Sequence, residues 1–526
     1  MLRKAQHKSL FICVLLSENI SLNIQDYKKK QNNYINKSKQ SMKTNFFSLS
    51  AVVIIACSLF SSCTKDSTTV STPPVVIGAA VSDTLSGGTV KGTMLSGKTY
   101  TIKRDLIVNA GDTLLLQPGV TLKMGRGKTI MVKGVFISLG TKALPNYIGP
   151  DKTFTKTDAA GYSAAADSAY VGYWTGINCE TSCTLLDLKW THVEYMGAKF
   201  GATLFPTGNK AGDGSFGIKF QNSTGDFIME DSWMYGSIDD AVRISTGRIH
   251  LMRNTFEKCG ATGGDCLNAK SGSVGDMAYN LFVGTATNGT KASNKGGVGP
   301  QTNINMYNNT YICGGYRQKD PTGRGGSINY EEGARGKAFN NLMVNCRTGV
   351  RIQSNPAADV VNMSYGYNYT YGDSLRVMNN VYPVGASLTS GTTSVTVPQS
   401  TDIPAYTALL SNPNYQQAYL YTIVGSVCTN LIAPYDGSAY VKVGNPLFTG
   451  FTLPMTGKLS DVSAVNTYSF KLQTGSPALA KGTTDATKIA PLNAVQVTNK
   501  NFKPTEVTLP GADMGCYQNN GTGNQH

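Results

Sequence analysis

The sequence predicts an all-β protein, a right-handed parallel β-helix in which short strands wind into stacked coils with lateral loop insertions. One indication is a polar residue that recurs between residues 231 and 341, each time followed two places later by a bulky apolar residue: Asp231, Asn254, Asn280, Asn309 and Asn341. The intervals between them are 23, 26, 29 and 32 residues. An Asp or Asn position that recurs every 20-odd residues is typical of a solenoid built from repeated turns.

The local pattern around these residues is a further indication. Apolar and polar residues alternate in the stretches at 227–233 and 249–256, with the period of two that a half-buried strand requires. The repeat region contains no long pattern of period 3.6, which would indicate a helix. Parallel strands of successive coils stack about 4.8 Å apart, so equivalent Asn side chains can form a ladder of amide hydrogen bonds.

A second column of residues stands eleven or twelve positions before each repeated Asp or Asn. Along the chain it consists of Lys219, Arg243, Asn268, Gly297 and Asn329, and Arg351 continues it. All but Gly297 lie between two apolar or small neighbours. Such neighbours face the core of a strand, so the residue between them faces outward. The constant offset predicts that one connecting loop takes up the insertions, and that one outer face carries a row of cations and amides.

The first 62 residues predict a leader. Residues 1–41 are basic and lack a strand or helix pattern, so we interpret them as an N-terminal extension upstream of a start at Met42. Lys43 and an apolar run at 46–60 then describe a signal peptide over 42–62. The run is too short to cross a membrane as a helix.

Cys63 directly follows two small residues at the end of this signal. This arrangement resembles the signal of bacterial lipoproteins, and the next three residues, Thr64-Lys65-Asp66, resemble the export tract of Bacteroidetes-type lipoproteins. The resemblance implies that Cys63 is acylated and anchors the protein in the outer membrane. We expect the folded domain to face the cell surface or the periplasm.

The remaining chain divides by composition. Residues 63–89 are rich in Ser, Thr and Pro and predict a flexible tether. Residues 90–517 predict the β-helix domain, within which 385–440 are irregular and predict an insertion. Residues 518–526 predict a disordered tail. We expect the protein to be a monomer.

Charge and cysteine usage restrict the function. The formal net charge is +15, and much of the excess lies in the leader, so the remaining positive charge is compatible with an acidic polysaccharide. An exported chain without a recognisable binding module is a poor fit for nucleic acid. Cys179 with Cys183, and Cys259 with Cys266, are local disulfide candidates, and buried thiols are the alternative. The sequence contains no Cys-x-x-Cys pair, which would be the usual indication of a zinc site.

Several segments resemble a known group of proteins. The alternating stretch at 99–140 resembles the first coils of exported right-handed parallel β-helix proteins of the pectin-lyase-like superfamily. The segments at 444–448, 472–482 and 511–517 resemble their C-terminal pattern. The superfamily includes polysaccharide lyases, glycoside hydrolases, esterases and non-catalytic surface proteins. The resemblance therefore implies the fold more directly than the function.

The outward column predicts the functional residues. Its cations are candidate catalytic residues, namely Arg243, Arg351 and Lys219. Candidate substrate-binding residues on the same face are Asn268, Asn329, Glu331 and Arg335. Asp240 and Asp265 occupy the same slot in consecutive coils, and two stacked carboxylates require a cation, an Arg or a shared proton between them. They are the candidate Ca²⁺ site.

These residues suit β-elimination on a uronic-acid polymer, which requires a neutralised carboxylate and a base for the C5 proton. The resemblance implies Lys or Arg as that base, so Arg243 or Arg351 would be the base or the carboxylate clamp. One alternative is a non-catalytic glycan-binding surface protein or adhesin. Another is a polygalacturonase-like hydrolase that uses Asp239 and Asp240 as paired acids.

Overall fold

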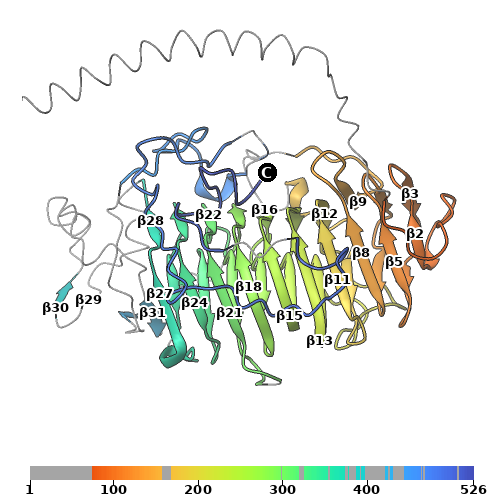
Figure 1. Ribbon diagram of the computed structural model, residues 1–526, viewed down its shortest axis with the longest axis horizontal. Coiled ribbons are helices and arrows are strands. Elements are labelled where there is room, and N and C mark those ends of the chain that lie inside the picture. The colour runs from red at the N-terminus through yellow and green to blue at the C-terminus, as the bar shows by residue number, and fades with distance from the viewer. Residues whose placement is uncertain are drawn as a thin grey trace, which may run out of the picture. The chain divides into compact units, whose positions relative to one another are not determined.

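The computed structural model describes residues 74–156, 167–297, 299–318, 325–353, 356–373, 377, 444–463, 465, 468–505 and 509–526, together with four short strands between 387 and 430. It confirms the predicted all-β, right-handed parallel β-helix (Figure 1). The predicted leader and the acylated Cys63 lie outside the described residues. No helix in the described part of the chain is long and apolar enough to span a membrane.

Each coil contributes a strand to each of three faces. The first face consists of β1 (Gly88–Thr89), β4 (Leu106–Val108), β7 (Thr129–Val132), β10 (Gly176–Cys179), β13 (Ile218–Glu230), β15 (Val242–Met252), β17 (Leu267–Ala269), β20 (Thr290–Ser293), β23 (Ile328–Glu331) and β26 (Val350–Ile352). Strands β13 and β15 continue into the second face, which makes the first two faces one 18-stranded sheet.

The second face adds β2 (Gly92–Met94), β5 (Thr113–Leu116), β8 (Val135–Leu139), β11 (Leu185–Lys189), β18 (Ser273–Ala278), β21 (Asn303–Tyr307), β24 (Gly336–Phe339) and β27 (Met363–Gly366). The third face is a separate ten-stranded sheet: β3 (Thr99–Ile102), β6 (Thr121–Met124), β9 (Asn146–Pro150), β12 (Thr191–Met196), β14 (Trp233–Ser237), β16 (Thr255–Cys259), β19 (Leu281–Val283), β22 (Thr310–Ile312), β25 (Leu342–Val344) and β28 (Tyr369–Tyr371).

Outside the coils, the described elements are short. Three 3-10 helices lie in connections, η1 (Ser168–Tyr170), η2 (Val360–Asn362) and η4 (Leu459–Asp461). In the predicted insertion at 385–440 the structure describes two antiparallel pairs, β29 (Ser387–Ser390) with β30 (Thr393–Thr396), and β31 (Tyr421–Val424) with β32 (Val427–Asn430).

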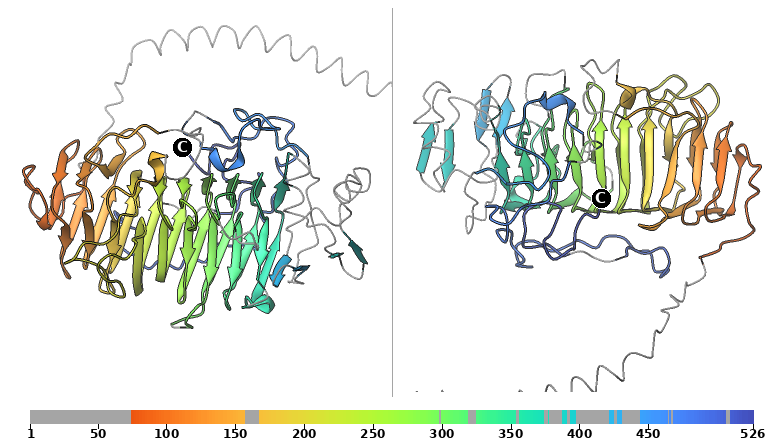
Figure 2. Two further views of the ribbon diagram at one scale, coloured as in Figure 1. Left: turned by 180° about the vertical axis from the view of Figure 1, so that it is seen from behind. Right: turned by 90° about the horizontal axis from the view of Figure 1, so that it is seen from above.

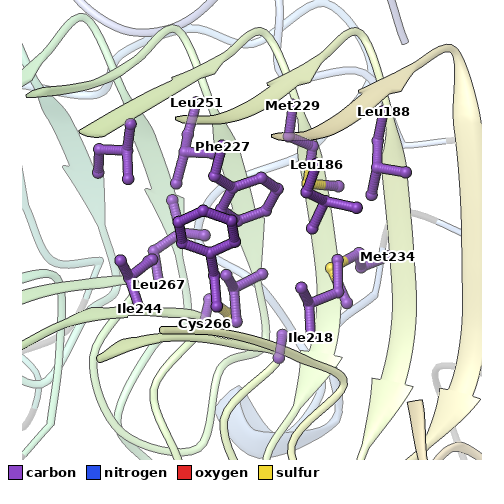
Figure 3. Packing of buried hydrophobic residues seen from close by; sticks show 14 of the residues in the cluster. Leu186, Leu188, Ile218, Phe227, Met229, Met234, Ile244, Leu251, Cys266 and Leu267 are labelled. Carbon is purple, nitrogen blue, oxygen red and sulfur yellow. The ribbon is translucent and has the colours of Figure 1, made fainter. Parts of the chain in front are cut away.

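Apolar side chains from all three faces fill the interior of the coils. Figure 3 shows how Phe227, Met229 and Leu251 of the second face meet Ile218 and Ile244 of the first. Rings also stack in register from coil to coil, since Phe256, Phe282 and Tyr311 lie at centroid distances of 5.2 and 4.9 Å with interplanar angles of 11°. The seven cysteines whose side chains the structure describes are all buried thiols, so the buried-thiol alternative holds for them.

The predicted Asn ladder lies at the turn between the second and third faces. The backbone N–H groups of Asn254, Asn280 and Asn309 each donate to the side-chain oxygen of the Asn in the next coil, at 3.0 Å. Asn341 and Asn368 extend the ladder. The side chains are fully or almost fully buried, and each amide NH₂ also donates to a backbone carbonyl or the next Asn.

Asp231 is not a member of this ladder, contrary to the prediction. Ser232 occupies the slot, because its N–H donates to Asn254 Oδ1. Asp231 instead sits one residue earlier, where the turn requires a left-handed backbone (φ 47°), and it pairs with Arg253 at 2.9 Å in the equivalent position of the next coil. The sequence pattern selected the polar residue two places before Trp233, whereas the ladder position in this coil is the residue directly before it.

The second predicted column also needs a correction. Asn268 pairs in register with Lys291, and Lys291 with Asn329, so Lys291 and not Gly297 occupies the slot. The offset to the Asn ladder is therefore not constant, because the insertion in this coil lies between β20 and β21 and not before β20. Insertions fall at more than one turn, and the prediction of a single lengthening loop is wrong.

The C-terminal part of the chain runs back over the coils. Residues 488–505, here called the strap, cross the second face from β24 towards β11 (Figure 1). The N–H of Leu492 donates to Asp276 Oδ2 at 2.9 Å, and the N–H of Thr505 donates to Glu230 Oε1 at 3.0 Å. Seen from above, the strap lies along one side of the coils (Figure 2).

Other C-terminal residues cover the third face. Apolar side chains of residues 448–489 and 514–516 form one buried cluster with outward-facing residues of β19, β22, β25 and β28. Residues 518–526 were predicted as a disordered tail, but Asn524 is buried and its amide donates to the carbonyl of Asn254 at 3.0 Å. The described part of the predicted tether also packs, since Val75 and Ile77 contact the second face.

Candidate functional site

The first face carries a polar pocket over β15, β17, β20, β23 and β26. It encloses about 270 Å³. Its described lining consists of Asp239, Asp240, Arg243, Gly264, Asp265, Asn268, Lys270, Thr287, Asn288, Lys291, Lys295, Gln318, Glu331, Glu332 and Arg351. This set contains five basic and five acidic side chains and no aromatic ring, so the described lining is formally neutral and strongly charged.

At Arg243 the structure agrees with the prediction that the column side chain points outward from the core. Val242 and Ile244 are fully buried in the core, whereas the Arg243 side chain between them is 25% exposed. Its guanidinium lies 4.3 Å from the ring centroid of Phe216 and donates to Asp240 Oδ2 at 2.6 Å. Burial alone lowers the pKa of Arg243, but the charges of Asp240 and Asp265 raise it above its usual value. Arg243 is therefore a fixed cation and a poor base.

Asp240 and Asp265 form a short ladder at the turn that leads into the first face. The N–H of Asp265 donates to Asp240 Oδ1 at 2.7 Å, and the N–H and side-chain amide of Asn288 donate to Asp265 Oδ1 at 3.1 and 2.8 Å. Asn268 bridges the pair by donating to both carboxylates, at 2.9 and 3.0 Å. Each carboxylate thus accepts hydrogen bonds at both oxygens.

This arrangement bears on the predicted calcium site. Ca²⁺ takes six to eight oxygen ligands, often from several carboxylates. Among the described residues there is no group of three or more His, Cys, Asp or Glu side chains placed to hold a metal ion. Arg243, Asn268 and Lys291 already provide the positive charge and the donors that two stacked carboxylates need. The residues present therefore fit a bridge of cationic side chains and amides better than they fit Ca²⁺.

Lys291 links the acid ladder to the next coils. Its ammonium lies 2.7 Å from Glu331 Oε1 and 3.9 Å from Asp265 Oδ2. Burial alone raises the pKa of Glu331, but Lys291 lowers it below its usual value. Asn329 donates to Glu331 Oε2 and accepts from Arg351, each at 2.9 Å. The result is a continuous network from Arg243 to Arg351.

Lys270 is a pocket residue that the sequence patterns missed. It directly follows β17, is partly buried, and lines the pocket beside Asn268. Within the described chain its ammonium makes no hydrogen bond or ion pair. Burial and the nearby charges of Lys291 and Arg243 lower its pKa. Its position two residues after Asn268 is the available signal, since residues two apart in an extended chain point to the same side.

Six of the nine candidate site residues line this pocket, namely Arg243, Arg351, Asn268, Glu331, Asp240 and Asp265. Asn329 is buried and connects Glu331 with Arg351 through its side-chain amide. Lys219 lies outside, because its ammonium donates to Thr207 O and Asn209 Oδ1 of the loop at 197–217. Arg335 follows the turn after β23 and lies 4.0 Å from Asp359.

Comparison of the chain with protein-family models, with curated proteins and with solved structures finds no match.

Proposed function

We propose that the first face binds an acidic polysaccharide and cleaves it by β-elimination, in the manner of the polysaccharide lyases of the pectin-lyase-like superfamily. The observation that carries the proposal is Lys270, an amine with a lowered pKa that lies between two fixed cations in the pocket. An ammonium of ordinary pKa cannot accept a proton near neutral pH, and burial beside like charges is how a lysine becomes a base.

In this proposal the fixed cations hold the substrate carboxylate. Arg243 and Lys291 lie in the coils before and after that of Lys270, about 4.8 Å away along the axis, and both are in register with Asn268, two residues before Lys270. A carboxylate clamped by either cation acidifies the neighbouring C5–H. The neutral amine of Lys270 takes the C5 proton, the C4–O bond breaks, a C4=C5 double bond forms, and the leaving oxygen takes a proton from water. The base is thus reassigned from Arg243 or Arg351 to Lys270, and the arginines become clamps.

The hydrolase alternative is less well supported. A glycosidase needs one carboxyl group free to protonate the leaving oxygen and a second that attacks or activates water. Asp240 accepts hydrogen bonds from Arg243, Asn268 and the backbone of Asp265. Both oxygens of Asp240 are therefore occupied by hydrogen bonds within the protein. Asp239 then lacks a second free carboxyl group, which a paired-acid mechanism requires.

The test is a lyase assay on the purified, full-length protein with polygalacturonate, alginate and glycosaminoglycans. The unsaturated product is followed by its ultraviolet absorbance, and binding is measured in parallel. Lys270→Met removes the proposed base, and Lys123→Met, an exposed lysine on the third face, is the matched control. Product formation that Lys270→Met abolishes and Lys123→Met leaves unchanged supports the proposal.

Two results would point elsewhere. Binding without product on every polymer would replace the lyase by the glycan-binding alternative, for which the dense set of donors and acceptors in the pocket is also suited. Full activity of the Lys270→Met protein would remove Lys270 from the mechanism. The proposed place of the protein, anchored through Cys63 in the outer membrane, is tested separately by metabolic labelling with a fatty acid and by a Cys63→Ala variant.

A further inference from the structure

The cations of the first face recur with a period of two coils. Arg243 pairs in register with Asn268, Asn268 with Lys291, Lys291 with Asn329, and Asn329 with Arg351. Cations and amides therefore alternate, and the cations are about 10 Å apart along the axis. Only the structure shows this alternation, because the sequence pattern assigned Gly297 to the slot that Lys291 holds.

The row has a defined beginning. Lys219 precedes Arg243 in register and would break the alternation, but its ammonium is held by Thr207 and Asn209. The loop at 197–217 thus takes Lys219 out of the row, while Phe216 at the end of that loop supports the guanidinium of Arg243. The three other column cations, Arg243, Lys291 and Arg351, all line the pocket.

The charge balance of the pocket sets a second condition. Its five basic side chains face five acidic ones, and the amides between the column cations lie next to carboxylates: Asn268 beside Asp240 and Asp265, and Asn329 beside Glu331. An anion opposite either amide would face these carboxylates, and like charges at this distance repel. The basic side chain beside Asn268 is Lys270, which is uncharged when it acts as the base. The row therefore suits a ligand of low charge density.

We propose that the ligand is an unsulfated copolymer in which every second sugar carries a carboxylate. This inference rests on the proposed function and specifies its substrate class. An extended chain of 1,4- or 1,3-linked pyranoses advances by about one coil spacing per sugar, so carboxylates on alternate sugars recur at about the two-coil period. Each acid then lies opposite a coil whose column residue is a cation, and each neutral sugar lies opposite a coil whose column residue is an amide. A homopolymer of uronic acid, or a sulfated chain, brings charges to coils in which the column holds an amide and no cation.

The experiment compares four polymers with the full-length protein: hyaluronan and unsulfated chondroitin, which have one acid per disaccharide, and polygalacturonate and polymannuronate, which have one per sugar. We expect at least tenfold higher kcat/KM, with tighter binding, for the first two. Equal or better turnover of either homopolymer would overturn the inference and leave β-elimination standing. Neither binding nor product with any of the four would overturn the proposed function itself.

A gain-of-function variant tests the spacing directly. Asn268→Lys places a cation in the coil between Arg243 and Lys291, and a lysine there still donates to Asp240 and Asp265. We expect it to shift the ratio of affinities towards the homopolymers by at least fivefold. An unchanged ratio in a variant with an unaltered melting temperature would overturn the inference. If that variant melts early, Arg351→Gln tests the length of the row by removing its last cation. The loss of affinity should be larger for tetrasaccharides and longer chains than for disaccharides, and an equal loss at every length would overturn the inference.

Discussion

Two ladders of stacked side chains in this protein use the same hydrogen bond with opposite consequences. In the Asn ladder, which runs from Asn254 to Asn368, side-chain oxygens accept backbone N–H groups from the preceding coil at 3.0 Å. In the acid ladder, Asp240 and Asp265 accept N–H groups from the following coil at 2.7 and 3.1 Å. The amides are neutral and donate to one another, so that ladder is complete in itself.

Carboxylates have no donor to offer, so the acid ladder cannot satisfy itself. Stacked charges must be balanced by cations, and here Arg243 and Lys291 take that role. These cations lie on the outward side of the first face, which turns a structural device into a charged pocket. Stacked acids thus draw cationic side chains to the first face, whereas stacked amides need none.

The largest expected effect is a loss of activity, without loss of stability, when the pocket residue Lys270 is replaced. Lys270→Met should lower kcat by about 10²–10⁴-fold, which is the usual contribution of a general base, and leave the melting temperature unchanged. In the native protein kcat/KM should rise with pH and level off below the ordinary lysine pKa, because the pKa of Lys270 is lowered. A pH profile measured on both proteins checks this, and an identical rise in the variant would assign the base elsewhere.

The next effect falls on stability. Asn309→Leu removes the acceptor for the N–H of Asn280 and the donor to the carbonyl of Met277. Each buried group left unpaired costs about 1–3 kcal/mol, so the protein should unfold at clearly lower denaturant concentration. The active fraction that remains folded should retain its kcat. Loss of kcat without loss of stability would contradict the separation of the two ladders.

A smaller effect is expected when the acid ladder is made to resemble the Asn ladder. Burial raises the pKa of Asp265, opposed by Lys291 and reinforced by Asp240. A raised pKa in the folded state means that ionisation of Asp265 costs stability, from its ordinary pKa upwards. Asp265→Asn should therefore raise the melting temperature at pH 7, and the gain should vanish well below pH 4, where both states are protonated. Lower stability at pH 7 would show that the charge of Asp265 stabilises the fold.

The smallest expected effect concerns metal. Since side chains already balance Asp240 and Asp265, we expect removal of Ca²⁺ with EDTA to change kcat/KM by less than twofold. Readdition of Ca²⁺ to the stripped protein is the control. A large loss that Ca²⁺ restores would reinstate the calcium site that the sequence predicts at these two residues.

Local patterns were sufficient for the coils and for the direction of the column residues. Alternation around Arg243 and Arg351 predicts their outward orientation, because a strand alternates faces at every residue. The same reasoning failed where register depends on loops. Gly297 was placed in the column since an offset of twelve points to it, whereas pairing with β17 and β23 selects Lys291. Lys270 was overlooked because no repeat marks it.

The sequence by itself determined the β-helix, the Asn ladder from Asn254 to Asn341, and the charged character of the first face, since all three follow from residue order within one or two strands. Tertiary structure alone decided which faces the C-terminal part of the chain covers. Residues 444–526 return from the far end to hydrogen-bond with the second and third faces, and the loop at 197–217 closes over Lys219. The contact between Leu492 and Asp276 joins residues 216 positions apart, and the free energy of closing so long a loop depends on the whole fold and not on local pattern.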